Sequence, residues 1–228
     1  FMENIEVILQ SFLSSDNDIR NGAKSFLIEH IMKNPDFFII LFQLYNNSEV
    51  QVIKKLSLIL IKCIISMNFQ ILEPKFQIFS ENLEKSLLSS TDTLMQKLFV
   101  GIVFELALKI GSPWPDFAKY LMFYTNGNYL HFSILLFRTC ILSPEINEKY
   151  GEILNQVQPQ LTLAGINSPD LDVAIMSSYL FVKCSKGNLI ENYQAFIGPI
   201  LTLAQNSLNF SENQFNSFWS AILNINAE

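Results

Sequence analysis

Few residues in this chain could carry out chemistry, and they lie far apart in the sequence. The 228 residues include two histidines, His30 and His131, and three cysteines, Cys63, Cys140 and Cys184. Histidine can act as a general acid or base near neutral pH, and a cysteine thiolate can act as a nucleophile. Neither has a catalytic partner in a recognisable motif, since HExxH, GxSxG, P-loop, histidine–aspartate and CxxC patterns are all missing from the sequence. We therefore predict that the protein is not an enzyme and has no catalytic residue, metal site or cofactor.

The cysteines and one acidic pair have plainer interpretations. The three cysteines are an odd, dispersed set inside apolar runs, which predicts buried free thiols in a reducing compartment. Asp16 and Asp18 form a D-x-D pattern, but the stretch lacks the glycine and the distal glutamate of a calcium-binding loop. We expect Asp16 or Asn17 to cap the helix that follows instead.

Composition and charge limit the partners. The chain is 50% hydrophobic and 16% charged, with a net charge of −6 and a pI of about 5. This acidic balance argues against direct nucleic-acid binding and favours partners with basic surfaces. The longest apolar stretches are 98–108, broken by Glu105, and 132–142, broken by Arg138. Both are shorter than the ~20 residues that span a bilayer, so we predict no membrane insertion.

Helical patterns cover the chain and fall into pairs. Apolar residues recur at spacings of three and four, with proline and glycine or polar residues between the segments. The predicted pairs are 3–13 with 17–33, 35–45 with 48–67, 74–88 with 91–110, 115–125 with 128–142, 146–164 with 169–186, and 189–207 with 211–225.

Particular residues mark the ends of these helices. We expect caps from Asn47 or Ser48 and from Thr91. Pro169 with Asp170 marks a helix start, and Ser211 with Glu212 fits a cap. Pro159 and Pro199 stand 40 residues apart inside two first helices, which indicates either a repeated feature or helices that are shorter and split.

The pairs repeat with a period typical of stacked helical units. An apolar–basic or apolar–amide dipeptide opens three second helices at Ile19-Arg20, Ile53-Lys54 and Met95-Gln96, in steps of 34 and 42 residues. We predict an all-α, right-handed α-solenoid of about six repeats forming one domain over residues 1–228. The repeats would be 3–33, 35–67, 74–110, 115–142, 146–186 and 189–225, each contacting only its neighbours, with the second helices on the inner face.

The end of the last pair suggested a further expectation. Its closing helix is apolar and no polar terminal unit follows it, so we expect the chain to be part of a longer solenoid. The side chains expected to be exposed there are Phe218, Trp219, Ile222 and Leu223.

Four motifs in order resemble the importin-beta (karyopherin-beta) family of nuclear transport receptors. The stretch Leu9–Ala23 resembles that family's opening HEAT repeat, and Ile53–Lys62 resembles the second. Phe104-Glu105-Leu106-Ala107 looks like a third-repeat motif, and Trp114-Pro115-Asp116-Phe117 looks like the opening of the fourth. The likeness covers nearly the whole chain.

This resemblance implies an N-terminal HEAT-repeat region that shuttles between cytoplasm and nucleus as a monomer. The inner helices 17–33, 48–67 and 91–110 would face Ran in its GTP form, outer clefts would bind the Phe-Gly repeats of nucleoporins, and the arch would wrap basic cargo. The implied Ran-facing residues are Arg20, Lys24, Lys54, Lys62 and Gln96, although exposed helical charges often have only a solvated or stacking role.

The sequence also departs from the family pattern. The arginine that often forms an Asp–Arg ladder between HEAT repeats is replaced by Lys54, Gln96, His131 and Asp172 in successive repeats. We therefore expect the stacking to depend mainly on apolar burial.

Two alternatives remain open. A tubulin-binding (TOG-type) HEAT module fits the length, but such modules resemble paddles with tryptophan and basic residues in the loops, and the loop Ser14–Asp18 has neither. The third class is a bare HEAT scaffold, such as a phosphatase or coat-complex subunit.

Overall fold

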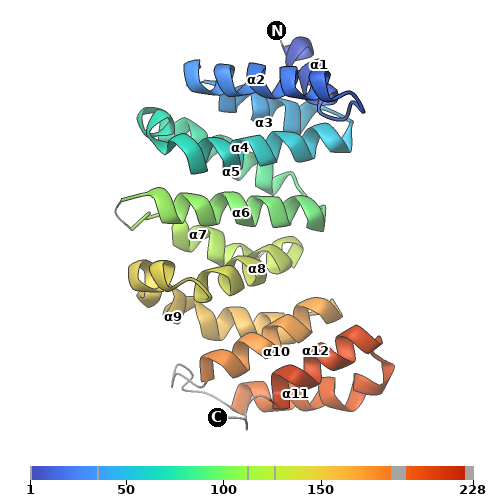
Figure 1. Ribbon diagram of the computed structural model, residues 1–228. Helices are drawn as coiled ribbons and strands as arrows, with labels where there is room; N and C mark the ends of the chain where they lie inside the picture. The colour runs from blue at the N-terminus through green and yellow to red at the C-terminus, as the bar shows by residue number, and fades with distance from the viewer. Residues whose placement is uncertain (1, 35, 112, 126, 186–193, 224–228) are drawn as a thin grey trace. The chain divides into compact units, whose positions relative to one another are not determined.

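The computed structural model describes residues 2–34, 36–111, 113–125, 127–185 and 194–223 (Figure 1). All regular structure in these ranges is helical and no strand occurs in them, which confirms the all-α prediction. The chain divides into two compact units, residues 1–111 (unit 1) and residues 112–228 (unit 2). Each unit is described by itself below, and the expectation of one domain with six stacked repeats stays a prediction.

Unit 1 consists of three helix pairs in two layers. Its helices α2, α4 and α6 form one layer, with α3 and α5 behind it (Figure 1). The predicted pairs are confirmed to within a few residues, except that α4 continues five residues further and is kinked at Asn68, whose φ and ψ are −152° and 55°. The elements are α1 (Met2–Ser11), α2 (Asn17–Lys33), α3 (Phe37–Asn47), α4 (Gln51–Leu72), the 3-10 turn η1 (Glu73–Lys75), α5 (Phe76–Leu88) and α6 (Thr93–Lys109).

Unit 2 repeats the arrangement. Helix α8 packs on α9, α9 packs on α10, and α10 packs on both α8 and α12. The predicted helix 115–125 is shorter than expected, because its second half is a 3-10 turn. The elements are α7 (Phe117–Leu121), η2 (Met122–Thr125), η3 (Gly127–Tyr129), α8 (Leu130–Ile141), α9 (Pro144–Ile166), α10 (Leu171–Ser185), α11 (Gln194–Asn206), η4 (Ser207–Asn209) and α12 (Glu212–Leu223). The predicted ends at 186, 189–193 and 224–225 lie outside the described residues.

Three of the predicted helix starts are confirmed. The Asp16 carboxylate accepts hydrogen bonds from the backbone N–H groups of Asp18 and Ile19, at 2.8 and 3.4 Å. Asp170 accepts from Asp172 and Val173 in the same way. Ser211 and Gln214 form a reciprocal capping box, in which each side chain accepts from the other's backbone N–H.

Two predicted caps are wrong. Asp92, not Thr91, caps α6, accepting from Leu94 N–H at 2.7 Å. Helix α4 starts after Val50 with no side-chain cap, because Ser48 lies two residues before this N-cap position and its hydroxyl accepts from Val50 N–H. Asp92 and Thr91 are neighbours that can both cap, so the sequence could not show which side chain reaches the helix.

Both internal prolines lie within unbroken helices. Pro159 is inside α9 and Pro199 is inside α11, so the split-helix alternative is wrong for these two helices. In both helices the described helical residues continue on either side of the proline. Just after Pro159, the Thr162 hydroxyl donates to the Gln158 carbonyl at 2.7 Å.

Aromatic side chains form much of the core. The Phe79 ring lies 5.2 Å from Phe38 and 5.4 Å from Phe42 between ring centroids, joining α3 to α5. In unit 2 the ring centroid of Phe117 lies 4.5 Å from that of Tyr150. The Tyr150 hydroxyl accepts a hydrogen bond from the backbone N–H of Trp114 at 2.9 Å. Phenylalanines on these helices are mostly enclosed: Phe104 is half-buried, and Phe37, Phe38, Phe42, Phe99, Phe132 and Phe137 are buried.

The end of α12 differs from its expectation. Phe218 is fully buried and packs against Phe210, and the Trp219 indole N–H donates to Ser207 Oγ at 3.2 Å. Trp219 and Ile222 are half-buried, and only Leu223 of the four predicted residues is exposed. Unit 2 therefore covers most of this apolar surface with its own turn η4 and the Phe210 that follows it.

Contacts between successive helix pairs repeat at a regular distance along the chain. Ser48 bonds to Glu6, Asn46 bonds to Ser86, and Gln214 bonds to Asp172, pairs separated by 42, 40 and 42 residues. Lys75 pairs with Asp36, 39 residues away. Equivalent positions of successive helix pairs therefore touch each other inside each unit. These polar contacts connect successive helix pairs of a chain in which the ladder arginine of HEAT repeats is mostly replaced.

One described segment could cross a membrane by length and composition. The stretch Gln51–Leu88 contains an 18-residue window with a mean hydropathy of 1.6, of which 33% is buried. Lys62 interrupts the apolar run in this stretch. The buried side of α4, which includes Ile53, Leu58 and Ile61, packs against α3 and α6, and core helices commonly have such composition. The absence of membrane insertion stays a prediction.

Candidate binding surface

The structure places two of the predicted Ran-facing residues on α2. Arg20 is half-buried, and its guanidinium donates to the Ser14 carbonyl and to Asn17 Oδ1. These bonds brace the turn between α1 and α2, so Arg20 has a structural task. Lys24 is exposed and available to a partner.

Two more of these residues lie on α4 and differ in exposure. The Lys54 ammonium is half-buried and lies 5.8 Å from the Tyr45 ring centroid, in a cation–π contact with α3. The Lys62 ammonium is exposed and lies 3.9 Å from Glu105 Oε1 on α6. Its side chain crosses Gly101, where an added Cβ would come within 3.5 Å of Lys62 Nζ. Gly101 therefore leaves room for the lysine to lie across the two helices.

Gln96 does not belong to the exposed surface. Its side chain is 1% exposed, and its Nε2 donates to the Ser90 carbonyl at 3.3 Å. It fastens the turn between α5 and α6 from inside the fold. A partner could not reach the Gln96 side chain in this structure, so Gln96 is not part of an exposed binding surface.

Charge is segregated between the layers of unit 1. Helices α2, α4 and α6 contain eight Lys/Arg and three Asp/Glu, whereas the rest of residues 1–111 contains two Lys/Arg and nine Asp/Glu. Charge counts over long stretches of the chain average the two layers and therefore do not reveal this separation. We call the solvent-facing side of α2, α4 and α6 the basic face.

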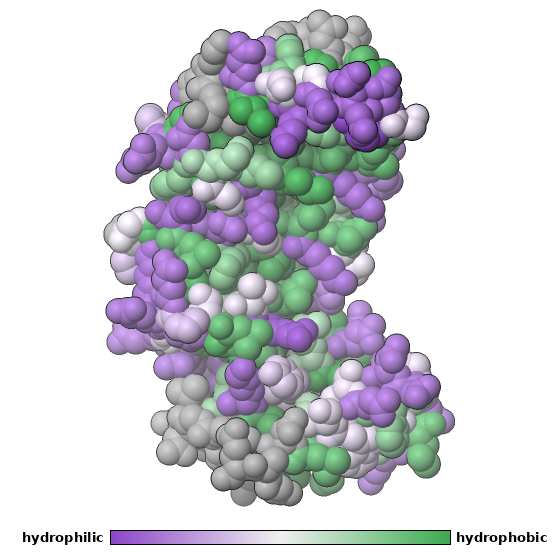
Figure 2. Space-filling view, in the orientation of Figure 1, coloured by the Kyte–Doolittle hydropathy of each residue, from purple (hydrophilic) through white to green (hydrophobic). Residues whose placement is uncertain are grey.

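Apolar side chains are interspersed among the lysines of the basic face. Ile28 on α2 is 45% exposed, and Ile59 and Met67 on α4 are 43% and 60% exposed. Lys97 and Lys109 on α6 are also exposed. Figure 2 shows hydrophobic and hydrophilic residues mixed over this side of unit 1. Such a mixture suits a protein partner that presents both acidic and apolar groups.

Two of the three cysteines are buried, which affects the pKa of their thiols. Burial raises the pKa of the Cys184 thiol to about 11 and raises the pKa of Cys140 further still. Both thiols are buried and stay protonated at neutral pH, while Cys63 is half-buried. Within the described ranges, no group of three or more His, Cys, Asp or Glu side chains is placed to hold a metal ion.

Comparisons with known proteins do not identify a family. No protein-family model, no curated protein and no solved structure matches this chain.

Proposed function

We propose that this chain is a right-handed HEAT-type solenoid that binds proteins and is not an enzyme. The observation that supports it best is the regular step of about 40 residues between contacting side chains in both units. A stack in which each helix pair touches the next produces contacts at the repeat length, and such stacks present long faces to partners.

In the finer form of the proposal, the chain belongs to a nuclear transport receptor of the importin-beta kind that shuttles as a monomer. The four motifs that resemble that family support it. Ran in its GTP form docks on the basic face and contacts Lys24 and Lys62, with Lys97 added from the structure. The exposure of these lysines and the apolar side chains between them support this contact.

The acidic remainder of unit 1 suits basic cargo. The nine acidic residues outside α2, α4 and α6 attract positively charged proteins, and binding of Ran and cargo is mutually exclusive through a coupling free energy.

Nucleoporin Phe-Gly repeats contact the outer helices. Ile78 and Leu88 on α5 are 45% and 44% exposed and offer apolar surface to a phenylalanine. The hollow beside Leu88 is otherwise lined by polar or charged groups, Glu81, Glu84, Lys85 and Ser89, so we expect this contact to be weak.

A pull-down of purified chain tests the Ran proposal. The immobilised chain is offered Ran loaded with a non-hydrolysable GTP analogue, Ran loaded with GDP, and tubulin dimer. We expect retention of GTP-loaded Ran and at least ten-fold less of the other two. The double variant Lys62→Glu/Lys97→Glu should lose Ran, whereas Lys85→Glu, an exposed lysine on α5, should bind as the wild type does.

Two results would contradict the proposal. Equal retention of the two nucleotide forms excludes a GTP-dependent receptor. Retention of tubulin that exceeds that of Ran favours the TOG-type alternative.

A further inference from the structure

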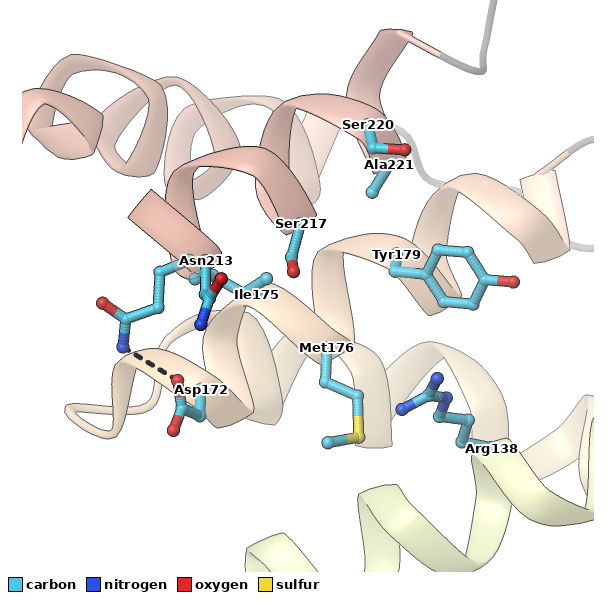
Figure 3. A pocket seen from close by; sticks show the side chains of 10 residues that line it. Arg138, Asp172, Ile175, Met176, Tyr179, Asn213, Ser217, Ser220 and Ala221 are labelled. Carbon is cyan, nitrogen blue, oxygen red and sulfur yellow. Dashed lines mark hydrogen bonds between the residues drawn. The ribbon is translucent and has the colours of Figure 1, made fainter. Parts of the chain in front are cut away.

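Unit 2 contains a pocket of about 410 Å³ that the proposed function does not use. It lies between α8, α10 and α12, and its residues are shown in Figure 3. Its volume is within the range typical of ligand sites. Its two ends carry opposite charges.

The first end is cationic. The Arg138 guanidinium carbon lies 5.9 Å from the Tyr179 ring centroid, and Lys183 Nζ lies 6.0 Å from the same centroid. Among the described residues, neither cation forms an ion pair with a carboxylate. Arg138 is exposed and directed into the pocket (Figure 3). Its planar set of N–H donors is suited to a carboxylate.

The second end is anionic and held in place. Asp172 Oδ1 accepts from Gln214 Nε2 at 2.8 Å. Gln214 in turn accepts from the Ser211 N–H and hydroxyl at 3.1 and 3.0 Å, as part of the cap of α12. This fixes the Asp172 side chain, and its second carboxylate oxygen keeps no hydrogen bond to another described residue.

The space between the ends is lined by apolar and neutral polar groups. Met176 lies between Asp172 and Arg138, with Ile175 and Ala221 buried beside it (Figure 3). Ser217 on α12 faces the pocket with its hydroxyl. Asp172 and Tyr179 are seven residues apart on one helix, which is about 10 Å at ~1.5 Å per residue. A chain in the polyproline II conformation rises ~3.1 Å per residue and returns to the same face every three residues, so it covers that distance in about three residues.

We propose that this pocket binds a short segment of a partner protein in the polyproline II conformation, which carries opposite charges three residues apart on one face. A glutamate or aspartate side chain of the segment pairs with Arg138. A lysine or arginine three residues away pairs with Asp172. The side chains between them pack on Met176, and Ser217 bonds to the segment's backbone. The site is independent of the Ran-binding proposal, since it uses only unit 2.

Charge argues for a peptide rather than a polyanion. Residues 112–228 contain five Lys/Arg and nine Asp/Glu, so unit 2 as a whole carries a net negative charge that disfavours a polyanion. Asp172 within the pocket would repel a second phosphate of a nucleic acid or polyphosphate. A dipolar segment matches both ends.

Fluorescence anisotropy with synthetic octapeptides tests this site in the whole chain. The probes contain Lys-Ala-Ser-Glu or the reversed Glu-Ser-Ala-Lys between Gly-Ser flanks, and matched peptides have glutamine in place of either charged residue. We expect one orientation to bind about ten-fold more tightly than both of its neutralised versions, as loss of a charge-assisted hydrogen bond predicts.

Variants assign the two ends. Arg138→Gln should remove the preference for glutamate, and Asp172→Asn, which can still accept from Gln214, should remove the preference for lysine. The control is Lys149→Gln, because Lys149 also lies over a tyrosine ring, 5.5 Å from the Tyr150 centroid, but outside the pocket. It should bind as the wild type does.

Several outcomes would overturn the proposal. These are equal binding of charged and neutralised peptides, unchanged binding by Arg138→Gln, or displacement of the probe by free glutamate or phosphate at the peptide's own concentration. The last result would assign the pocket to a small anion.

Discussion

At the scale of single residues, aspartates hold the starts of three helices. Asp16, Asp92 and Asp170 each accept two backbone N–H groups that the helix cannot pair internally. Their negative charge also suits the positive end of the helix dipole. The N-terminal turns of α2, α6 and α10 therefore depend on one side chain each.

This dependence predicts different effects for two adjacent substitutions. Asp92→Ala should lower the free energy of unfolding by about 1 kcal/mol, because two N–H groups of α6 lose their acceptor. Thr91→Ala should change it by less than about 0.5 kcal/mol, since the threonine does not cap. Urea denaturation followed by circular dichroism measures both. A larger loss for Thr91→Ala would assign the cap to the threonine.

The three thiols should differ in reactivity because only the thiolate attacks a disulfide reagent. Burial raises the pKa of Cys184 to about 11 and that of Cys140 beyond it, so both are protonated at pH 8 and become more reactive only as the pH rises. With Ellman's reagent at pH 8 we expect one fast thiol, Cys63, and three after denaturation. Two fast thiols in the native chain would contradict this order, and Cys63→Ser should abolish the fast phase.

Burial is also the property that the sequence could not supply for individual side chains. The motif position of Gln96 matched that of Arg20 and Lys54, yet its side chain is enclosed while Lys24 and Lys62 are exposed. The Gln96 side chain points back to the Ser90 carbonyl. Which side of a helix faces a neighbour depends on the packing of distant segments, and a single sequence does not fix that.

At the scale of elements, α9 and α10 approach each other through a glycine. A Cβ added at Gly165 would lie 1.9 Å from Ser177 Oγ, 2.7 Å from Ser177 Cβ and 2.9 Å from Ile134 Cδ1. Ser177 cannot rotate away freely, because its hydroxyl donates to the Val173 carbonyl at 2.8 Å. The close packing of these helices therefore requires the missing side chain.

Two glycines of the same helix should respond in opposite directions. Gly165→Ala should destabilise the protein by about 1–3 kcal/mol through overpacking. Gly151→Ala, where nothing lies within 4 Å of the added Cβ, should stabilise it by about 0.5–1 kcal/mol, since alanine favours a helix. Thermal denaturation compares the two. Equal shifts in the melting temperature would mean that α9 and α10 are less closely packed than described.

The helices themselves were the most predictable feature. Apolar spacing and turn residues located all of the helix pairs, because both are local properties of the chain. The charge difference between helices α2, α4 and α6 and the rest of unit 1 also follows from the sequence, because it needs only a count of charged residues within the predicted helix ranges. The pocket of unit 2 could not have been found in this way, since Arg138, Asp172 and Gln214 come from three helices.

At the scale of the whole molecule, the contact pattern makes a prediction about how strain spreads. Contacts in both units join residues about 40 apart, so a defect in one pair should reach the adjacent pairs and weaken with distance along the chain. A globular core in which all helices share one centre would spread the same defect everywhere. The two architectures therefore differ in a measurable property.

Hydrogen exchange in the variant Leu161→Ala measures it. Leu161 is fully buried in α9, and its truncation should cost about 2–5 kcal/mol by leaving a cavity. We expect faster amide exchange in α8, α9, α10 and the helices that pack on them, and unchanged exchange in α2 and α3, more than 100 residues away. Phe79→Ala, a buried residue of α5, is the matched variant from unit 1 and should leave α10 and α12 unchanged. Uniform loss of protection in both variants would favour a single cooperative core, because only a shared core transmits each defect to every helix.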